Sequence, residues 1–181
     1  PMVVACNKID VHGALTNFNK MKEQFKDHLL IPCSAESELA LKEASKNKLI
    51  NYLPGENDFQ ILEKGKLSEQ QQKALFFIKE NILEKVGSTG VQSILDSAVF
   101  DLLKYIAIFP GGVNNLEDQD GNTLPDCFLM PPKTTALDFA YRLHTDFGKK
   151  FIRAIDVKTK MTVGKDHLLK HRDVVEIVSG R

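Results

Sequence analysis

The sequence predicts an α/β fold that changes to an α+β fold in its last third. Two apolar runs separated by a helix-length interval open the chain, two helical stretches with start signals follow, and short strands around a single helix close it. These observations divide the chain into an opening unit at 1–50, a helical linker at 51–104 and a closing domain at 105–181.

The opening unit is predicted from apolar runs at 2–6 and 29–33, which are typical of short buried strands. The interval between them, 11–28, is long enough for one helix. This order predicts a right-handed βαβ unit whose strands end at one sheet edge, where open α/β sheets bind ligands. A further helix is expected at about 37–48. The residues expected to face the sheet from the first helix are Leu15, Phe18, Met21 or Lys22, and Phe25. The second helix is indicated by Leu39, Ala40, Ala44 and Leu49.

Polar residues follow both predicted strands. Asn7, Lys8 and Asp10 come directly after the first, and Ser34 and Ala35 come directly after the second. A carboxylate at position 10 can accept two hydrogen bonds, from the ring N1–H and the 2-amino group of guanine, whereas adenine has no such pair of donors. The Lys8 stem can lie over the ring, Asn7 can bridge the base to nearby loops, the Ala35 N–H can donate to the 6-oxo group, and the Ser34 hydroxyl can brace the first loop. The alternative is that these residues only form turns.

The linker contains two helix-start patterns, Ser68 with Gln71 and Thr89 with Gln92, each typical of a capping box. Gly87 between them favours a helix end. An apolar stripe at helical spacing predicts an ordinary helical core, and the alternative is a groove for a partner. The first stripe consists of Leu75, Ile78, Ile82 and Val86, with Phe76, Phe77 and Phe100 widening the apolar surface.

The closing domain is predicted as an α+β roll. Strands are expected at 106–109, 127–130, 151–155, 160–163 and 173–178, with one helix that begins after Thr135. The acidic turn at 118–122 is too short for a calcium-binding loop and lacks a distal Glu.

Basic residues gather in the closing domain although the whole chain has a formal net charge of zero. Between positions 149 and 172 eight Lys or Arg residues stand against two acids, a formal local charge of +6. Such a surface can neutralise nucleic-acid phosphates, or it can simply solvate one side of a sheet. Tyr141 and Phe151 can stack on bases but are expected in the core. The eight basic residues are Lys149, Lys150, Arg153, Lys158, Lys160, Lys165, Lys170 and Arg172.

Composition restricts the remaining classes. No apolar run reaches the roughly 18 residues of a membrane span, and no signal peptide is present. Three cysteines at irregular spacing indicate neither a disulfide framework nor a zinc site, which fits a reducing cytoplasm. Cys6 and Cys33 end the two predicted strands, either as small core residues or as a redox pair.

The closing domain resembles a TGS domain, which is a β-grasp, ubiquitin-like module. The resemblance is carried by residues 171–177 and by the stretch 129–148, Leu-Met-Pro-Pro-Lys-Thr-Thr-Ala-Leu-Asp-Phe-Ala-Tyr-Arg-Leu-His-Thr-Asp-Phe-Gly. The Asn-Lys-Ile-Asp and Ser-Ala-Glu motifs resemble the fourth and fifth guanine-specificity motifs of P-loop GTPases. The whole chain therefore resembles the C-terminal part of an Obg-superfamily GTPase of the YchF/HSR1-related, archaeal type. YchF proteins depart from Asn-Lys-x-Asp and favour ATP, whereas Asn7, Lys8 and Asp10 are retained here, which favours guanine.

The resemblance implies a fold and a set of ligands and partners. The opening unit would be the carboxyl edge of a P-loop GTPase sheet that binds GTP or GDP, with Mg²⁺ in the intact protein. The TGS domain would contact the ribosome, rRNA or tRNA. No Gly-x-x-x-x-Gly-Lys-Ser/Thr phosphate loop occurs in the chain, so we expect a longer protein and assign no catalytic residue here. The alternative is a β-grasp module that binds RNA or protein without a nucleotide.

Overall fold

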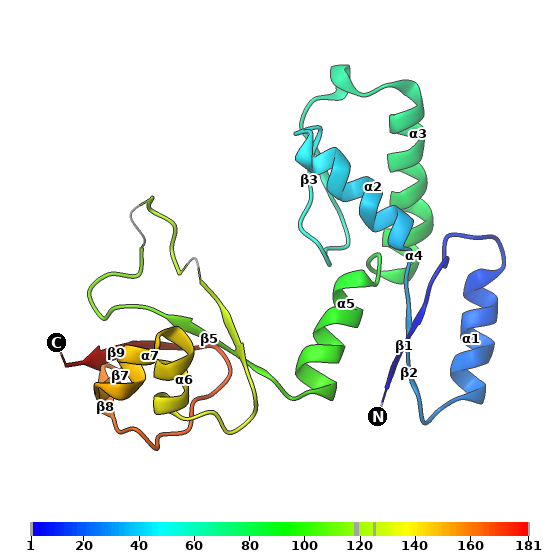
Figure 1. Ribbon diagram of the computed structural model, residues 1–181. Helices are drawn as coiled ribbons and strands as arrows, with labels where there is room; N and C mark the ends of the chain where they lie inside the picture. The colour runs from blue at the N-terminus through cyan, green and yellow to red at the C-terminus, as the bar shows by residue number, and fades with distance from the viewer. Residues whose placement is uncertain (1, 118–119, 125, 181) are drawn as a thin grey trace. The chain divides into compact units, whose positions relative to one another are not determined.

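The computed structural model describes residues 2–117, 120–124 and 126–180 and divides the chain into two compact units, 1–102 and 103–181 (Figure 1). Within the described residues, none of the helices combines the length and the apolar character needed to cross a lipid bilayer. The acidic turn expected at 118–122 falls partly outside the described residues.

The first unit opens with the predicted βαβ arrangement, which is confirmed. Strands β1 (Val3–Cys6) and β2 (Leu29–Pro32) are parallel, and helix α1 (Ala14–Gln24) connects them. The expected inward face of α1 was too wide, because only Phe18 is buried, whereas Met21 and Phe25 are 38% and 44% exposed. Since α1 ends at Gln24, Phe25 lies beyond the helix.

Helix α2 (Ala35–Lys46) begins two residues earlier than expected, because the Ser34 side chain caps it by accepting a hydrogen bond from the Ser37 N–H at 3.2 Å. Leu41 is fully buried, whereas Leu39 is 60% exposed and Ala40 is also exposed.

The linker begins with a short hairpin of β3 (Ile50–Asn51) and β4 (Gln60–Ile61), followed by a 3₁₀ turn, η1 (Lys64–Lys66). The Ser68–Gln71 capping box is confirmed, with both reciprocal hydrogen bonds present. It starts a continuous helical stretch of α3 (Glu69–Ile78), the π-helical η2 (Lys79–Leu83) and α4 (Glu84–Val86). The stretch ends at Gly87, as expected, where φ is +93°.

The second capping box was wrong. Helix α5 (Val91–Asp96), which continues into the π-helical η3 (Ser97–Leu102), begins after Gly90, and the Thr89 hydroxyl donates instead to Glu38 of α2. The Thr89 hydroxyl therefore forms a tertiary hydrogen bond in place of the expected local cap.

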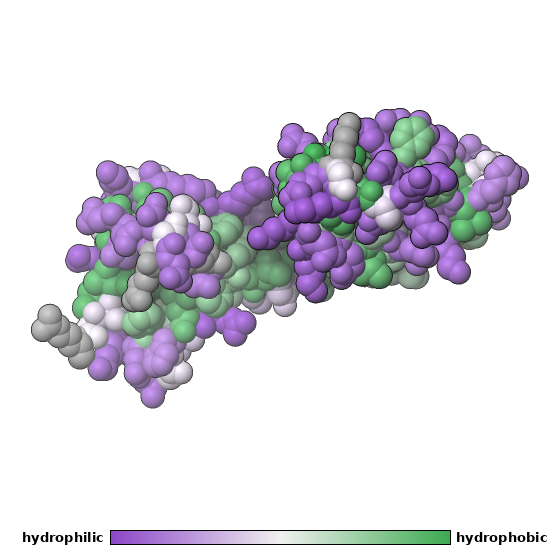
Figure 2. Space-filling view, turned by 90° about the horizontal axis from the view of Figure 1, so that it is seen from above, coloured by the Kyte–Doolittle hydropathy of each residue, from purple (hydrophilic) through white to green (hydrophobic). Residues whose placement is uncertain are grey.

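The core of the first unit joins the βαβ part to the linker. Leu41 of α2, Ile50 of β3 and Ile82 of η2 are each at most 1% exposed and belong to one cluster, and α2 and α3 lie side by side (Figure 1). Leu75, Ile78 and Ile82 of the predicted stripe are thus core residues. Phe76 and Phe77 are exposed instead, and Phe76 lines a groove of about 850 Å³ between α3 and β4. Figure 2 shows that hydrophobic residues are exposed among the hydrophilic ones on the surface.

The second unit is the predicted α+β roll. Its strands are β5 (Ile106–Pro110), β6 (Phe128–Met130), β7 (Phe151–Asp156), β8 (Met161–Val163) and β9 (Asp173–Ser179). They form a mixed sheet with the order β6-β5-β9-β7-β8, in which β5 and β9 are parallel and the other described pairs are antiparallel. Helix α6 (Ala136–Leu143) follows the second strand, and the short α7 (Thr145–Lys149) precedes the third.

Helix α6 supplies the core of this unit. Thr135 caps it in a capping box with Asp138, and Phe139 is fully buried against Ile108, Ala154 and Val175 of the sheet. Tyr141 was expected in the core but is 48% exposed, because its ring lies on the surface over Gly148.

Candidate functional site

The two polar loops that follow β1 and β2 lie side by side at the carboxyl edge of this parallel pair. Backbone hydrogen bonds join them, from Ile9 N to Cys33 O at 3.1 Å and from Cys33 N to Cys6 O at 3.0 Å. The parallel register places Cys6 opposite Pro32, so both chains leave the sheet at the same level. The sheet therefore brings the residues after each strand to one edge, as the sequence predicted.

Asn7 ties the first loop to the second. Its side-chain Oδ1 accepts hydrogen bonds from the Lys8 N–H at 2.8 Å and from the Ala35 N–H at 3.1 Å. The Cys33 thiol lies 3.9 Å from the same oxygen. The Ala35 N–H, which was expected to face a ligand, thus has an intramolecular partner.

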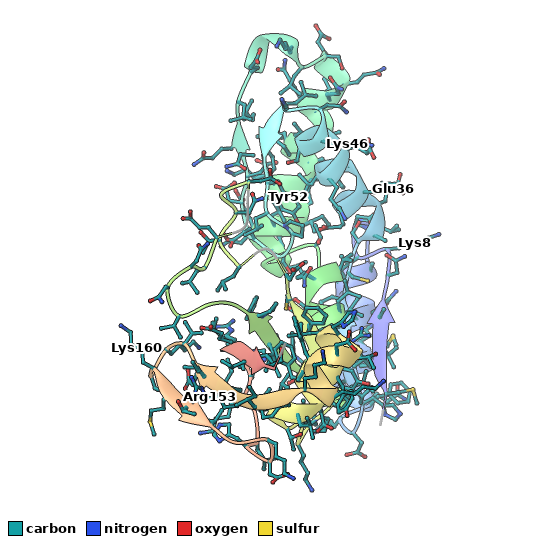
Figure 3. The ribbon with its side chains drawn as sticks, turned by 60° about the vertical axis from the view of Figure 1, so that its left-hand side comes forward. Lys8, Glu36, Lys46, Tyr52, Arg153 and Lys160 are labelled. Atoms are coloured by element: carbon teal, nitrogen blue, oxygen red, sulfur yellow. The ribbon has the colours of Figure 1, made fainter. Side chains whose placement is uncertain are left out.

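Lys8 and Asp10 flank the buried Ile9. Lys8 has a positive φ of 66°, and its side chain extends away from the ribbon into solvent (Figure 3). Lys8 and Asn7 line a hollow of about 430 Å³, whereas Asp10 lines a neighbouring one of about 190 Å³ beside Lys85. Asp10 is only partly buried, and a carboxylate in that position can accept hydrogen bonds from a ligand.

The Ser34 hydroxyl contacts Ser37 of α2 and not the first loop, which it was expected to brace. Ser34 is fully buried, and its hydroxyl donates to Ser37 Oγ at 2.8 Å as well as capping α2. The brace between the loops comes from Asn7 and the backbone instead, so Ser34 acts by fixing where α2 begins.

The cysteine pair has the character of core residues. Both thiols are free, and Cys33 is 3% exposed. Burial, with a smaller effect from Cys6, raises the pKa of the Cys33 thiol and keeps it protonated. A protonated thiol is a poor nucleophile, so the structure favours the core interpretation.

Sequence reasoning missed a buried polar cluster behind the second loop. The Glu38 carboxylate of α2 is 6% exposed, and its Oε2 accepts from Tyr52 Oη at 2.7 Å and from Thr89 Oγ1 at 2.6 Å. Burial, followed by the hydrogen bond to Glu38, raises the pKa of Tyr52 to about 12. Helical spacing could have indicated Glu38, because it is four residues after the cap Ser34 and three before the buried Leu41.

No metal centre is assigned. In the segments 2–117, 120–124 and 126–180, no group of three or more His, Cys, Asp or Glu side chains is arranged to hold a metal ion. We therefore name no Mg²⁺ ligand in this chain.

Comparison with known families identifies this arrangement. Residues 5–113, more than half of the chain, match the model of the G4 motif-containing domain of YGR210-like, Obg-like GTPases. The chain belongs to this family of Obg-like GTPases. Residues 119–179 of the Obg-like chain match the TGS domain model, which confirms the β-grasp prediction for the second unit.

Individual relatives agree with this assignment. An uncharacterised GTP-binding protein of Methanocaldococcus jannaschii is 47% identical over 180 residues, which are 99% of this chain and 45% of that protein. Another, from Schizosaccharomyces pombe, is 31% identical over 75% of this chain and 35% of its own length. The crystal structure of a GTP binding protein from Pyrococcus horikoshii has 39% identity and a TM-score of 0.67, over 99% of this chain and 46% of that one. The chain spans less than half the length of these relatives.

The eight basic residues of the TGS domain are all exposed but do not form one patch. Four of them, Lys158, Lys160, Lys170 and Arg172, lie where β7 ends and β9 begins, and the Lys158 ammonium donates to the Arg172 carbonyl. Lys160 lies at the β7–β8 turn (Figure 3). The remaining four lie elsewhere, with Lys149 and Lys150 just before β7, Arg153 within β7, and Lys165 beside the start of α6.

Proposed function

We propose that the first unit is the base-recognition edge of a protein that binds GTP and GDP. The observation that carries this proposal is the junction of the Asn7–Asp10 and Ser34–Ala35 loops at the carboxyl edge of β1 and β2, held by the Asn7–Ala35 hydrogen bond. Membership of the Obg-like GTPases and the three GTP-binding relatives support it.

In this proposal Asp10 reads the guanine base. Its carboxylate accepts from the ring N1–H and the 2-amino group, and the Lys8 stem covers one face of the ring. Adenine presents neither donor in that position, so its binding would leave the carboxylate unpaired at a cost in affinity.

Ala35 would read the 6-oxo group. Because its N–H already donates to Asn7 Oδ1 at 3.1 Å, it reaches the base oxygen by forming a three-centre hydrogen bond or by releasing Asn7. Asn7, Lys8, Asp10, Ser34 and Ala35 thus form the proposed guanine-binding set, with Ser34 acting through α2.

Hydrolysis of GTP is proposed for the full-length protein and is assigned to no residue of this chain. Phosphoryl transfer depends on a phosphate cradle and on Mg²⁺, which neutralises charge on the β- and γ-phosphate oxygens. What this chain supplies is selection of the base and connection of the base edge to the helical linker.

The test is calorimetric titration of the full-length protein with GDP, GTP and ATP. We expect selective binding of GDP and GTP, and at least a tenfold loss of GDP affinity in Asp10→Ala, since two charge-assisted hydrogen bonds are removed. Asp27→Ala, which removes an exposed acid between α1 and β2, is the matched control and is expected to bind GDP normally. Equal affinity for GDP and ATP would reject the proposal.

A second candidate function is RNA binding by the TGS domain, favoured by the gathering of Lys158, Lys160, Lys170 and Arg172 at one end of its sheet. The proposed partners are the ribosome, rRNA or tRNA, in the cytoplasm. Replacing Lys160 and Lys170 by Gln is expected to weaken binding to a tRNA and to lower the slope of log affinity against log salt by about 1.4, at roughly 0.7 for each phosphate contact. Lys149→Gln with Lys150→Gln is the control, and an equal effect of both pairs would reject this location. If RNA binding is independent of GDP and GTP, and neither nucleotide binds, the nucleotide-independent module is the better description.

A further inference from the structure

Glu38 forms a buried connection between three segments that are distant in the sequence. Its Oε2 accepts from Tyr52, just after β3, and from Thr89, just before α5, at 2.7 and 2.6 Å. Thr89 is fully buried and Tyr52 is 7% exposed, so water does not compete with these hydrogen bonds (Figure 3 labels Tyr52). A buried carboxylate that keeps two hydroxyl partners defines the position of each segment closely.

Thr89 holds the beginning of α2 at two points. Its hydroxyl binds Glu38 one turn into the helix, and its carbonyl accepts from the Ser34 N–H at 2.9 Å. The Ser34 carbonyl in turn accepts from the Glu38 N–H at 3.1 Å. These three hydrogen bonds form a closed ring around the first turn of α2.

Gly90 brings this ring close to the strand. An added Cβ would overlap the Pro32 carbonyl oxygen and would lie 2.9 Å from Cys33 Cβ, and φ is +79°. Only glycine meets both conditions, so Thr89 is pressed against the end of β2.

The ring of hydrogen bonds includes the peptide group that joins Ser34 to Ala35. The carbonyl oxygen of this peptide group, Ser34 O, accepts from Glu38 N, and Ser34 N of the preceding peptide group donates to Thr89 O, so the direction of the Ala35 N–H is fixed. We propose that Thr89 and Glu38 are positioning residues for guanine recognition, which aim the Ala35 N–H at the 6-oxo group of the base. This inference rests on the proposed function and adds to it residues that lie outside the loops.

The test compares three nucleotides on the full-length protein. GDP carries every recognised group, 6-thio-GDP replaces the 6-oxo acceptor with a weaker sulfur acceptor, and IDP lacks the 2-amino group that Asp10 is proposed to read. We expect the wild-type protein to prefer GDP over 6-thio-GDP by about three- to tenfold, the range of one neutral hydrogen bond. In Thr89→Val, which keeps the shape of the side chain and removes the hydroxyl, this preference is expected to fall to less than twofold.

Two further variants separate positioning from general damage. Thr89→Ser retains the hydroxyl and is expected to restore the preference for GDP over 6-thio-GDP. Glu38→Gln retains one acceptor oxygen for both hydroxyls but loses the charge, so an intermediate preference is expected. Because this change is isosteric, it also serves if Thr89→Val does not fold.

The outcomes distinguish the inference from the proposed function. Preference for GDP over IDP is expected to persist in Thr89→Val, because Asp10 is not altered. If Thr89→Val and Glu38→Gln both keep the full preference over 6-thio-GDP, or if Thr89→Val loses both preferences equally, the positioning role is refuted. If the wild-type protein does not distinguish GDP from IDP, the proposed guanine site itself is wrong.

Discussion

Replacing Gly90 with alanine perturbs the junction between the second loop and α5 at a single atom. Left-handed backbone costs a residue with a Cβ about 1–2 kcal/mol, and at Gly90 φ is +79°. The added Cβ also overlaps the Pro32 carbonyl oxygen, a backbone atom that cannot rotate away. Forcing an extra methyl into a packed site typically adds about 1–3 kcal/mol. We therefore expect Gly90→Ala to lower the free energy of unfolding by about 2–5 kcal/mol.

Gly13 offers a matched control. It precedes α1 as Gly90 precedes α5, it has the same φ of +79°, and an added Cβ there would meet no atom within 4 Å. Gly13→Ala should therefore show only the backbone cost of about 1–2 kcal/mol. Equilibrium urea unfolding followed by circular dichroism measures both variants. Equal losses would refute the claim that close approach, rather than backbone conformation, makes Gly90 necessary.

Two other predictions concern the cores of the two units. In alkaline titration of the chain, Tyr52→Phe should remove a phenolate absorbance step at a pH of about 12. The folded-state pKa of Tyr52 is raised above its ordinary value. The stability that this hydroxyl contributes is therefore fully present below the unfolded-state pKa of about 10 and is lost as the pH rises toward 12. An unchanged titration curve would contradict the buried Glu38 contact. In the TGS domain, Phe139→Ala should lower the free energy of unfolding by about 3–5 kcal/mol, since this ring is fully buried, whereas Leu129→Ala on a 46% exposed side chain should cost much less. Comparable losses in urea unfolding would contradict the assigned core.

The two capping patterns of the linker show how far local sequence predicts structure. Ser68-x-x-Gln71 forms a capping box, and in the part of the chain that the structure describes no distant group takes the Ser68 hydroxyl. Thr89-x-x-Gln92 has the same local signal, but the Glu38 carboxylate, 51 positions earlier, takes the Thr89 hydroxyl. Local patterns therefore predict a helix start only where no hydrogen bond to a distant buried acceptor replaces the local cap.

The candidate site likewise combines features that the sequence predicts with contacts that it does not. The positions of Asn7, Asp10 and Ala35 at one sheet edge followed from the βαβ order, because parallel strands end together. The hydrogen bond between Asn7 and the Ala35 N–H did not follow from it, because it depends on the side-chain direction of Asn7 across two loops. The buried position of Glu38 was hidden by placing the start of α2 two residues late.

In the proposed site, selection of guanine depends most directly on Asp10. The decisive measurement is the affinity of the full-length protein for GDP and for XDP, in wild type and in Asp10→Asn. Xanthine has a 2-oxo group where guanine has an amine, so the Asn side-chain N–H should now donate to it. We expect the wild-type protein to prefer GDP and Asp10→Asn to prefer XDP. An unchanged preference for GDP in Asp10→Asn would contradict the account and reduce the loop to a turn.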